Sequence, residues 1–405
     1  MYSRNFYLDR IEPFLGTPVI KIITGMRRVG KSAFLQLLAD HFRTKLATPA
    51  DHMLYIDKES LEFEDIVDYR DLHARAKAAF ADKSGRKLLL VDEIQEIGQW
   101  ERAIASLAKD QSLDIVITGS NAHMLSSELA TLLAGRYIEF PIYTLSLSEF
   151  LRFRERPPEH AQQSFAEYIK YGGLPGLSQF PLDEPVIYAY ISGIYHTILL
   201  KDVVKRNQVR SVAQLESIAR YLFDNIGNIT SASRIAQFVR SQRLSLSVDT
   251  VQNYLRFFTD AFVAYRVPRY DLKGKRLLEI HEKYYLGDVG LRHALLGYRE
   301  GDISGILENV VYMELRRRGY EVCIGSLGGK EIDFIATRQS EKVYIQVAYL
   351  LASPDTITRE LTPLQSIPDN YPKLILSLDT TFGHDLAGIQ RINLIDWLMQ
   401  ATSEA

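Results

Sequence analysis

The segment GMRRVGKS, Gly25–Ser32, constrains the fold of this chain more than any other stretch. It matches the pattern G-x-x-x-x-G-K-[ST], and it lies between the apolar run VIKIIT and the helical pattern AFLQLLADHF. Glycines let the backbone turn its N–H groups inward around a phosphate, and the N-terminus of the following helix adds partial positive charge. This context predicts a phosphate-binding loop. The alternative is a plain strand-turn-helix in which the letters match by chance.

A second segment, KLLLVDEIQEI, supports the phosphate-binding interpretation. Its continuous apolar run is typical of a strand that is buried on both faces of a parallel sheet, and it ends at Asp92 and Glu93. Ligands of open α/β sheets lie at the carboxyl ends of strands. We therefore expect Asp92 to hold Mg²⁺ through water and Glu93 to act as the general base for the attacking water. An acidic pair that simply marks the end of a buried strand is the alternative.

The predicted ligands are ATP and Mg²⁺. Lys31 would contact the β and γ phosphates and Ser32 would ligate the metal with Asp92. The residues expected to bind the nucleotide are Gly25, Arg28, Gly30, Lys31, Ser32 and Ala33.

Two further strand-like runs complete the expected sheet. MLYIDKES, Met53–Ser60, precedes a helical pattern over Glu64–Ala81, and an extra strand at this point is typical of ATPases with a catalytic glutamate beside the aspartate. DIVITGSN ends in polar residues, and Thr118, Ser120 and Asn121 are placed to reach the γ phosphate and the lytic water. Ser and Asn are also strong N-cap residues, so capping of a helix over 124–133 is an equal alternative.

In the order of these motifs the chain resembles bacterial and archaeal AAA+-type ATPases that carry a C-terminal domain of unknown function. The resemblance extends over nearly the whole chain through GMRRVGKS, LLLVDEIQ, ITGSN, LAGRY, the FP and SLSEFL segments, YGGLPG and LGDVGL. It implies that Arg136 acts on nucleotide, from the same subunit or as a finger from a neighbour in a homo-oligomer or ring. A surface ion pair is the alternative for Arg136.

Length and composition predict more than one domain and a cytoplasmic protein. A chain of 405 residues with 46% hydrophobic content fits about two or three domains. One cysteine suits a reducing compartment, and no apolar run reaches the roughly 18 residues that a membrane span requires. The polar, proline-containing stretch Arg152–Gln163 is interpreted as a linker. We expect an α/β chain with an ATPase core over 1–155, a helical and winged-helix region over 156–300 and a nuclease-like α/β domain over 301–405.

The middle region resembles a winged helix-turn-helix. Helices are predicted over Val212–Asn225, Ser231–Arg243 and Ser247–Phe258, and a two-stranded wing follows them. Although the net charge of the chain is −2, this region is locally basic. DNA contact, mainly to phosphates, is one interpretation, and a solvated face or a subunit contact is the other. The basic residues are Arg234, Arg240, Arg243, Arg256, Arg266, Arg269, Lys273, Lys275 and Arg276.

The C-terminal region resembles the PD-(D/E)xK nuclease fold. Glu308 on a predicted helix and Asp333 on a predicted strand match its first two acidic positions, but Gln346 and Ala348 replace the expected E-x-K. The loss of one charged ligand and of the lysine predicts a domain that does not cut DNA. Glu308 and Asp333 would then hold a metal weakly or form a buried pair that supports the fold.

The sequence therefore predicts an Mg²⁺-dependent ATPase that couples ATP hydrolysis to DNA binding or remodelling. An ATP-dependent switch that recruits a protein partner, with slow turnover, is the alternative. An active nuclease is disfavoured, because it would need a replacement ligand such as Glu331.

Overall fold

The computed structural model describes residues 3–122, 133, 135–243, 246–380, 385–386 and 388–400. The chain forms two compact units. The first contains Met1–Tyr143 with the short segment Asp260–Phe262, and the second contains Thr144–Thr259 with Val263–Ala405. The division into three domains at residues 155 and 300 remains an interpretation of the sequence. The expected helix over 124–133 falls almost entirely outside the described residues.

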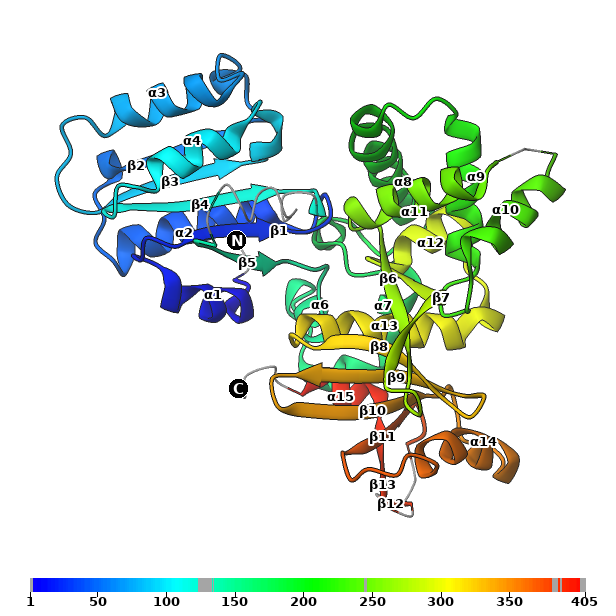
Figure 1. Cartoon of the computed structure of the whole chain (residues 1–405). Coiled ribbons are helices and arrows are strands. Elements are labelled where there is room, and N and C mark those ends of the chain that lie inside the picture. The colour runs from blue at the N-terminus through cyan, green and yellow to red at the C-terminus, as the bar shows by residue number, and fades with distance from the viewer. Residues whose placement is uncertain are drawn as a thin grey trace. The chain divides into compact units, whose positions relative to one another are not determined.

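The first unit is a parallel sheet covered by helices (Figure 1). Its strand order is β2-β3-β4-β1-β5, and every neighbouring pair is parallel. The strands are β1 Ile20–Thr24, β2 Met53–Asp57, β3 Lys87–Asp92, β4 Leu113–Gly119 and β5 Tyr137–Pro141. The helices are α1 Asn5–Ile11, α2 Lys31–Thr44, α3 Tyr69–Ala79 and α4 Trp100–Leu107, with short 3₁₀ helices at Glu12–Phe14, Ala50–His52, Leu61–Phe63 and Ile94–Glu96.

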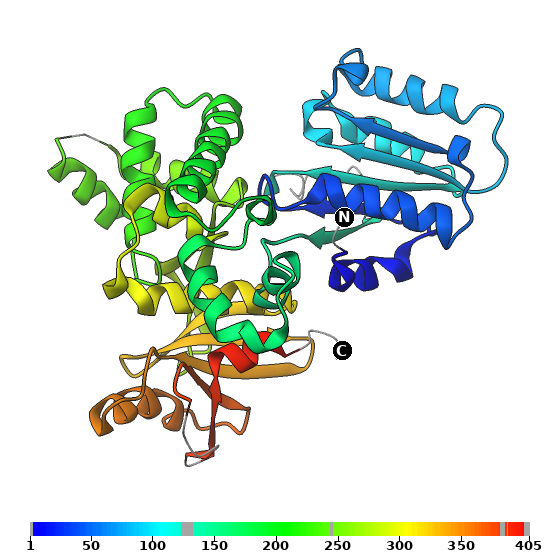
Figure 2. The same ribbon diagram turned by 180° about the vertical axis from the view of Figure 1, so that it is seen from behind.

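Apolar side chains from both faces of this sheet are buried, as the unbroken apolar runs predict. All residues of β1, β3 and β4 are buried. Alternate residues of these strands, such as Ile22 and Val91, pack with Leu72 of α3 and Ile104 of α4 in one core. Helix α2 lies on the other face, as Figures 1 and 2 both show. The predicted α/β class is confirmed.

Helix α3 is shorter than the expected 64–81. It begins after Asp68, whose side chain accepts from the backbone N–H groups of Arg70 and Asp71. The preceding residues turn around Lys58, which donates to the carbonyl oxygens of Phe63 at 2.5 Å and Ile66 at 2.8 Å. An N-cap and a lysine that binds backbone carbonyls thus replace the first helical turn.

The second unit combines helices with a mixed sheet of eight strands in the order β12-β13-β11-β10-β9-β8-β6-β7. The strands are β6 Ala264–Asp271, β7 Arg276–Leu286, β8 Glu321–Leu327, β9 Lys330–Arg338, β10 Glu341–Val347, β11 Lys373–Ser377, β12 Asp385–Leu386 and β13 Ile389–Asn393. The helices are α6 Leu147–Phe153, α7 Ala161–Tyr171, α8 Glu184–Thr197, α9 Val212–Asp224, α10 Ala232–Ser241, α11 Val248–Asp260, α12 Val289–Leu296, α13 Ile303–Arg317, α14 Pro354–Gln365 and α15 Leu394–Met399. A π-helical segment, Ile198–Lys205, continues α8, and 3₁₀ helices lie at Pro158–His160, Pro175–Gln179 and Glu300–Asp302.

The hairpin expected to be a wing joins the C-terminal sheet. β6 and β7 are antiparallel, and Arg269–Asp271 of β6 pairs in parallel with Ile324–Ser326 of β8. The stretch 152–163, expected to be a linker, lies inside the second unit. Arg154 within it donates to the carbonyl oxygens of Phe180 at 2.7 Å and Leu177 at 2.6 Å, so this polar stretch is anchored rather than free.

The motifs YGGLPG and LGDVGL meet in the second unit around Asp288. This buried carboxylate accepts from the N–H of Gly173 at 2.7 Å and of Gly290 at 2.8 Å. Gly172 has φ 82°, and a Cβ atom there would lie 1.9 Å from Asp288 Oδ1. Only glycine fits this approach, and a Cβ atom at Gly290 would likewise lie 2.3 Å from the carbonyl oxygen of Tyr171.

Candidate nucleotide site

The candidate site lies at the carboxyl edge of the five-stranded sheet. The GMRRVGKS loop follows β1, the acidic pair ends β3, and Thr118 lies near the end of β4. Because the strands are parallel and β4 lies between β1 and β3, these three strand ends meet at one edge. This is the edge at which open α/β sheets bind ligands.

The loop geometry requires its glycines. Gly25 has φ 148°, and a Cβ atom there would lie 2.2 Å from the carbonyl oxygen of Ile142. Gly30 is left-handed, with φ 97° and ψ 26°, and it directly precedes α2. Arg28 also has a positive φ, 69°, a conformation that side chains rarely adopt. The backbone therefore turns sharply before a 14-residue helix whose first N–H groups have no partner within the helix.

Lys31, the first residue of α2, folds back over this loop. Its side chain is buried, and its Nζ donates to the carbonyl oxygens of Gly25 at 3.2 Å and Met26 at 3.3 Å. The same atom lies 3.4 Å from Oε1 of Glu93. The ammonium is thus held between the loop and the acidic strand, where phosphates on the loop would meet it.

Asp92 is held by Thr118 from the neighbouring strand. The Thr118 hydroxyl donates to Asp92 Oδ1 and accepts from the backbone N–H of Glu93 at 3.0 Å. Burial raises the pKa of Asp92, and hydrogen bonds from Ser32 and Thr118 offset part of that rise. A carboxylate that touches Ser32 in a buried, polar setting is chemically suited to Mg²⁺, which prefers oxygen ligands.

Glu93 is positioned by its backbone as well as by its partners. It has φ 51° and ψ 49°, a left-handed conformation that is uncommon for a residue with a side chain. Its Oε2 accepts from Ser120 at 3.1 Å and from the amide of Gln95. Backbone strain of this kind is concentrated at functional sites.

The charges around Glu93 keep it ionised. Burial raises the pKa of this carboxyl, but Lys31, Arg27 and the hydrogen bonds from Gln95 and Ser120 together lower it by more, so the net pKa lies below the ordinary value. An ionised carboxylate can accept a proton from water, which is the role that the sequence predicted for Glu93.

Arg27 is a residue of this site that the sequence analysis missed. It is 8% exposed, and its Nη1 lies 2.8 Å from Oε1 of Glu59, which follows β2. An arginine in a loop does not reveal from sequence alone where its side chain points. The only signal for Arg27 was its position within GMRRVGKS.

Of the polar residues at the end of β4, the structure brings Thr118 and Ser120 into contact with the acidic pair. Asn121 follows them and is buried, 6% exposed. Thr118 and Ser120 thus belong to the candidate site, whereas the capping alternative concerns a helix that lies almost entirely outside the described residues.

Arg136 lies away from this cluster. It is exposed and precedes β5, and its carbonyl oxygen accepts from the N–H of Ile20, the first residue of β1. Ile20 pairs with Tyr137, and Thr24 pairs with Pro141 at the other end of the two strands. Four residue steps of about 3.3 Å separate those ends. Arg136 is thus at the amino edge of the sheet, opposite the edge that carries the loop and the acidic pair, and its action on nucleotide stays a prediction.

Two predicted residues of the second unit converge on a lysine. Glu308 of α13 and Asp333 of β9 both face Lys283 of β7, whose Nζ lies 3.0 Å from Glu308 Oε2 and 4.0 Å from Asp333 Oδ1. Among the described residues, no group of three or more His, Cys, Asp or Glu side chains is arranged to hold a metal ion. Within the same residues, no helix is long and apolar enough to cross a membrane.

Comparisons with known proteins agree with this architecture. An AAA domain model matches residues 17–151, and a domain of unknown function, DUF8612, matches residues 162–302. The chain is similar in fold to the Walker-type ATPase PABY2304 of Pyrococcus abyssi, with TM-score 0.51 and 14% identity over 73% of this chain and 96% of that one.

Two relatives share most of the chain. An uncharacterized protein of Haemophilus influenzae is 37% identical over 402 residues, 99% of each chain. The uncharacterized protein MJ1544 of Methanocaldococcus jannaschii is 30% identical over 349 residues, 82% of this chain and 75% of its own. These matches show that the chain, which carries an AAA domain, belongs to one family with the relatives from Haemophilus influenzae and Methanocaldococcus jannaschii.

Proposed function

We propose that the chain is an Mg²⁺-dependent ATPase that hydrolyses ATP to ADP and phosphate. The observation that carries this proposal is the placement of an ionised Glu93 within 3.4 Å of the loop lysine, at the edge of the sheet where phosphates bind. The AAA domain match and the Walker-type ATPase fold support it.

Each residue of the site has a distinct task in this reaction. Lys31 and the backbone of the loop, including Gly25, Arg28, Gly30 and Ala33, bind the phosphates. Ser32 and Asp92 would hold Mg²⁺, which would supply positive charge to the phosphate oxygens. Glu93 accepts a proton from water as the water oxygen bonds to the γ phosphorus and the bond to the β–γ bridging oxygen breaks. Asn121 and Ser120 orient that water.

Arg136 is proposed to act in trans. Its exposed position at the amino edge of the sheet suits contact with the nucleotide of a neighbouring copy in a homo-oligomer or ring. An arginine supplied in this way stabilises charge on the transferring phosphoryl group.

The test is steady-state ATP hydrolysis with Mg²⁺ by wild type and Glu93→Gln. We expect the glutamine variant to lose about 10²–10⁴-fold in kcat while still binding ATP, since only the base is removed. Glu96→Gln is the matched control, because Glu96 is exposed three residues further along the same turn. Equal turnover in wild type and Glu93→Gln would refute the assignment of the base.

DNA is the proposed partner of the ATPase, through the winged-helix region. Helices α9, α10 and α11 precede the β6–β7 hairpin, and Thr230, between α9 and α10, forms an antiparallel bridge with Glu282 of β7. A helix, a bridging residue, two further helices and a hairpin, in this order, are typical of a winged helix, in which the last helix enters the major groove.

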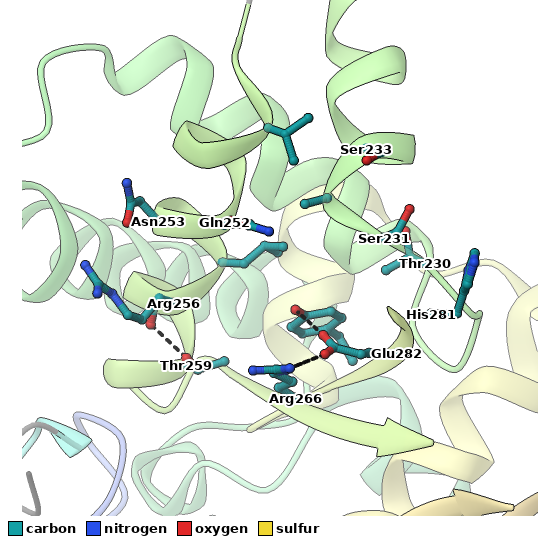
Figure 3. A pocket seen from close by; sticks show the side chains of 14 residues that line it. Thr230, Ser231, Ser233, Gln252, Asn253, Arg256, Thr259, Arg266, His281 and Glu282 are labelled. Atoms are coloured by element: carbon teal, nitrogen blue, oxygen red, sulfur yellow. Dashed lines mark hydrogen bonds and ion pairs between the residues drawn. The ribbon is translucent and has the colours of Figure 1, made fainter. Parts of the chain in front are cut away.

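Exposed polar side chains support this proposal. Gln252, Asn253 and Arg256 are exposed on α11 and line a groove of about 470 Å³ (Figure 3). The N-terminus of α10 and the hairpin residues Arg266 and Glu282 complete its wall. Gln, Asn and Arg are the side chains that pair with base edges. Lys273, Lys275 and Arg276 are exposed at the hairpin turn, where phosphate contacts would form.

Hydrolysis with and without single-stranded, duplex and branched DNA tests this part. We expect one DNA form to raise the Glu93-dependent rate several-fold and Arg256→Ala to weaken that effect. Arg359→Ala, an exposed arginine on α14, is the control. A slow rate that no DNA changes would instead favour the alternative, an ATP-dependent switch that recruits a protein partner.

A further inference from the structure

Lys283 is a buried cation surrounded by carboxylates. Its side chain is 3% exposed, and its Nζ lies 2.7 Å from Glu331 Oε1, 3.0 Å from Glu308 Oε2 and 4.0 Å from Asp333 Oδ1. The lysine comes from β7, whereas its partners come from α13 and β9. Four ionisable groups from three elements thus converge at one point of the second unit.

The neighbours of this cluster fix it in place. Tyr285 donates to Glu308 Oε2 at 2.8 Å, and the N–H of Val347 donates to Asp333 Oδ2 at 2.8 Å. Gln346 accepts from the backbone N–H of Asp333 at 3.2 Å. The side chain of Gln346 is therefore used to hold the strand β9, not to supply a charged ligand.

The lysine remains charged in this setting. Burial lowers the pKa of Lys283, but the carboxylates of Glu308, Asp333 and Glu331 raise it by more, so the net pKa lies above the ordinary value. A buried ammonium is stable only where such partners surround it.

Lys283, Glu308, Glu331 and Asp333 form a centre that does not fit a divalent metal. Glu308 and Asp333 occupy the positions that a nuclease of the PD-(D/E)xK type would use for Mg²⁺, and Glu331 is the replacement ligand that an active nuclease would need. All three already face the ammonium of Lys283. Ala348 packs in an apolar core with Ile332 and Tyr344, so it supplies no polar group to the centre.

We propose that Lys283 replaces the divalent cation of a nuclease-like centre, so that this centre excludes metal and serves instead to fasten the β6–β7 hairpin to the C-terminal sheet. The ammonium of Lys283 occupies the position among the carboxylates that a metal ion would take. Lys283 is itself a residue of the β6–β7 hairpin. The hairpin is therefore bonded to α13 and β9 through charge as well as to β8 through backbone pairing.

The first test is Mn²⁺ binding to the full-length chain in the absence of nucleotide. Lys283→Met removes the ammonium and keeps a side chain of similar length, and we expect it to bind Mn²⁺ about tenfold more tightly or better than wild type, since three carboxylates then face one space. Mn²⁺ should also raise the Tm of this variant and not that of wild type. Lys342→Met is the control, because Lys342 lies on the same sheet and faces Asp369 at 3.6 Å.

A double variant locates the new site. Mn²⁺ affinity gained in Lys283→Met should be lost in Lys283→Met/Asp333→Asn, whereas binding near Asp92 is common to all of these proteins. A folded Lys283→Met protein that binds Mn²⁺ no better than wild type would overturn the proposal.

Wild type provides a test that does not depend on folding of the lysine variant. We expect Glu308→Gln to bind Mn²⁺ as the wild-type chain does. Mn²⁺ binding by wild type that Glu308→Gln abolishes would show a metal in the centre and refute the role of Lys283.

Discussion

Lys31 and Glu93 form a buried ion pair, with 3.4 Å between Nζ and Oε1. The pair joins the phosphate-binding loop to the end of β3, so the two motifs that the sequence places about 60 residues apart act as one site.

Lys31→Met should weaken ATP binding by about ten- to a hundredfold, because a charge-assisted hydrogen bond contributes about 1.5–3 kcal/mol. Titration with a fluorescent ATP analogue measures the change. Lys45→Met, at the far end of α2 and exposed, should bind as wild type does. Unchanged affinity in Lys31→Met would place the phosphates elsewhere.

The pH dependence of turnover should report the charges on Glu93. Since Lys31 and Arg27 hold the pKa of Glu93 below its ordinary 4.5, the base is ionised throughout pH 5–8 and this group leaves kcat/KM flat there. The contribution of Glu93 to the free energy of unfolding is fully present above pH 4.5, the pKa in the unfolded chain. It is lost as the pH falls through the lower pKa that Glu93 has in the folded state.

Arg27→Met should raise the pKa of Glu93 and shift the acid limb of kcat/KM toward higher pH. Arg43→Met, an exposed arginine of α2, should leave that limb in place. An acid limb that is the same in all three proteins would mean that Arg27 does not act on Glu93.

Thr118→Val should lower both stability and turnover. The Thr118 hydroxyl donates to Asp92 and accepts from the N–H of Glu93. An isosteric valine leaves that N–H without its partner, at a cost of about 1–3 kcal/mol, and removes one of the hydrogen bonds to Asp92. Urea unfolding and ATP hydrolysis measure the two effects. Thr48→Val is the control, because the buried Thr48 hydroxyl has no hydrogen-bond partner among the described residues. Similar losses in both variants would argue against a special role for Thr118.

Mixing Arg136→Ala with Glu93→Gln should restore ATP hydrolysis. If Arg136 acts on a neighbour, mixed oligomers contain some sites that have both an intact Glu93 and an intact Arg136. Each variant alone should be slow. Lys109 is another exposed cation and precedes β4. As a control, the Lys109→Ala variant should hydrolyse ATP at the wild-type rate without mixing. No recovery on mixing, under conditions where wild type assembles, would contradict action in trans.

Asp288 should make stability depend on pH. Burial raises the pKa of this carboxyl to about 7, while the unfolded chain has 3.8. Between these values the folded state holds the extra proton, so the free energy of unfolding falls as pH rises, by at most about 1.4 kcal/mol per pH unit, and levels off above pH 7.

Urea unfolding at several pH values checks this expectation. Asp288→Asn should be less stable and should lose the pH dependence, because its amide cannot titrate and its NH₂ replaces the oxygen that accepts from the N–H of either Gly173 or Gly290. Asp183→Asn, an exposed control, should unfold with the wild-type pH dependence. The same slope in Asp288→Asn as in wild type would assign the effect to other groups.

Sequence reasoning located most of the nucleotide site because that site is built from local patterns. A strand buried on both faces is a continuous apolar run, and a loop that approaches phosphate needs glycine, so Gly25, Lys31, Asp92 and Glu93 are visible without a structure. The helices around residues 212–260 were likewise predicted to within a few residues, since their apolar faces repeat with helical periodicity.

The sequence by itself thus determined the α/β class, the loop and the acidic strand. Tertiary structure alone decided which distant residues meet. The order of the strands places Thr118 against Asp92 and places Arg136 at the opposite edge of the sheet. The pairing of β6 with β8 places Lys283 next to three carboxyl groups, those of Glu308, Glu331 and Asp333. Such contacts depend on strand order and register, which no local pattern of residues encodes.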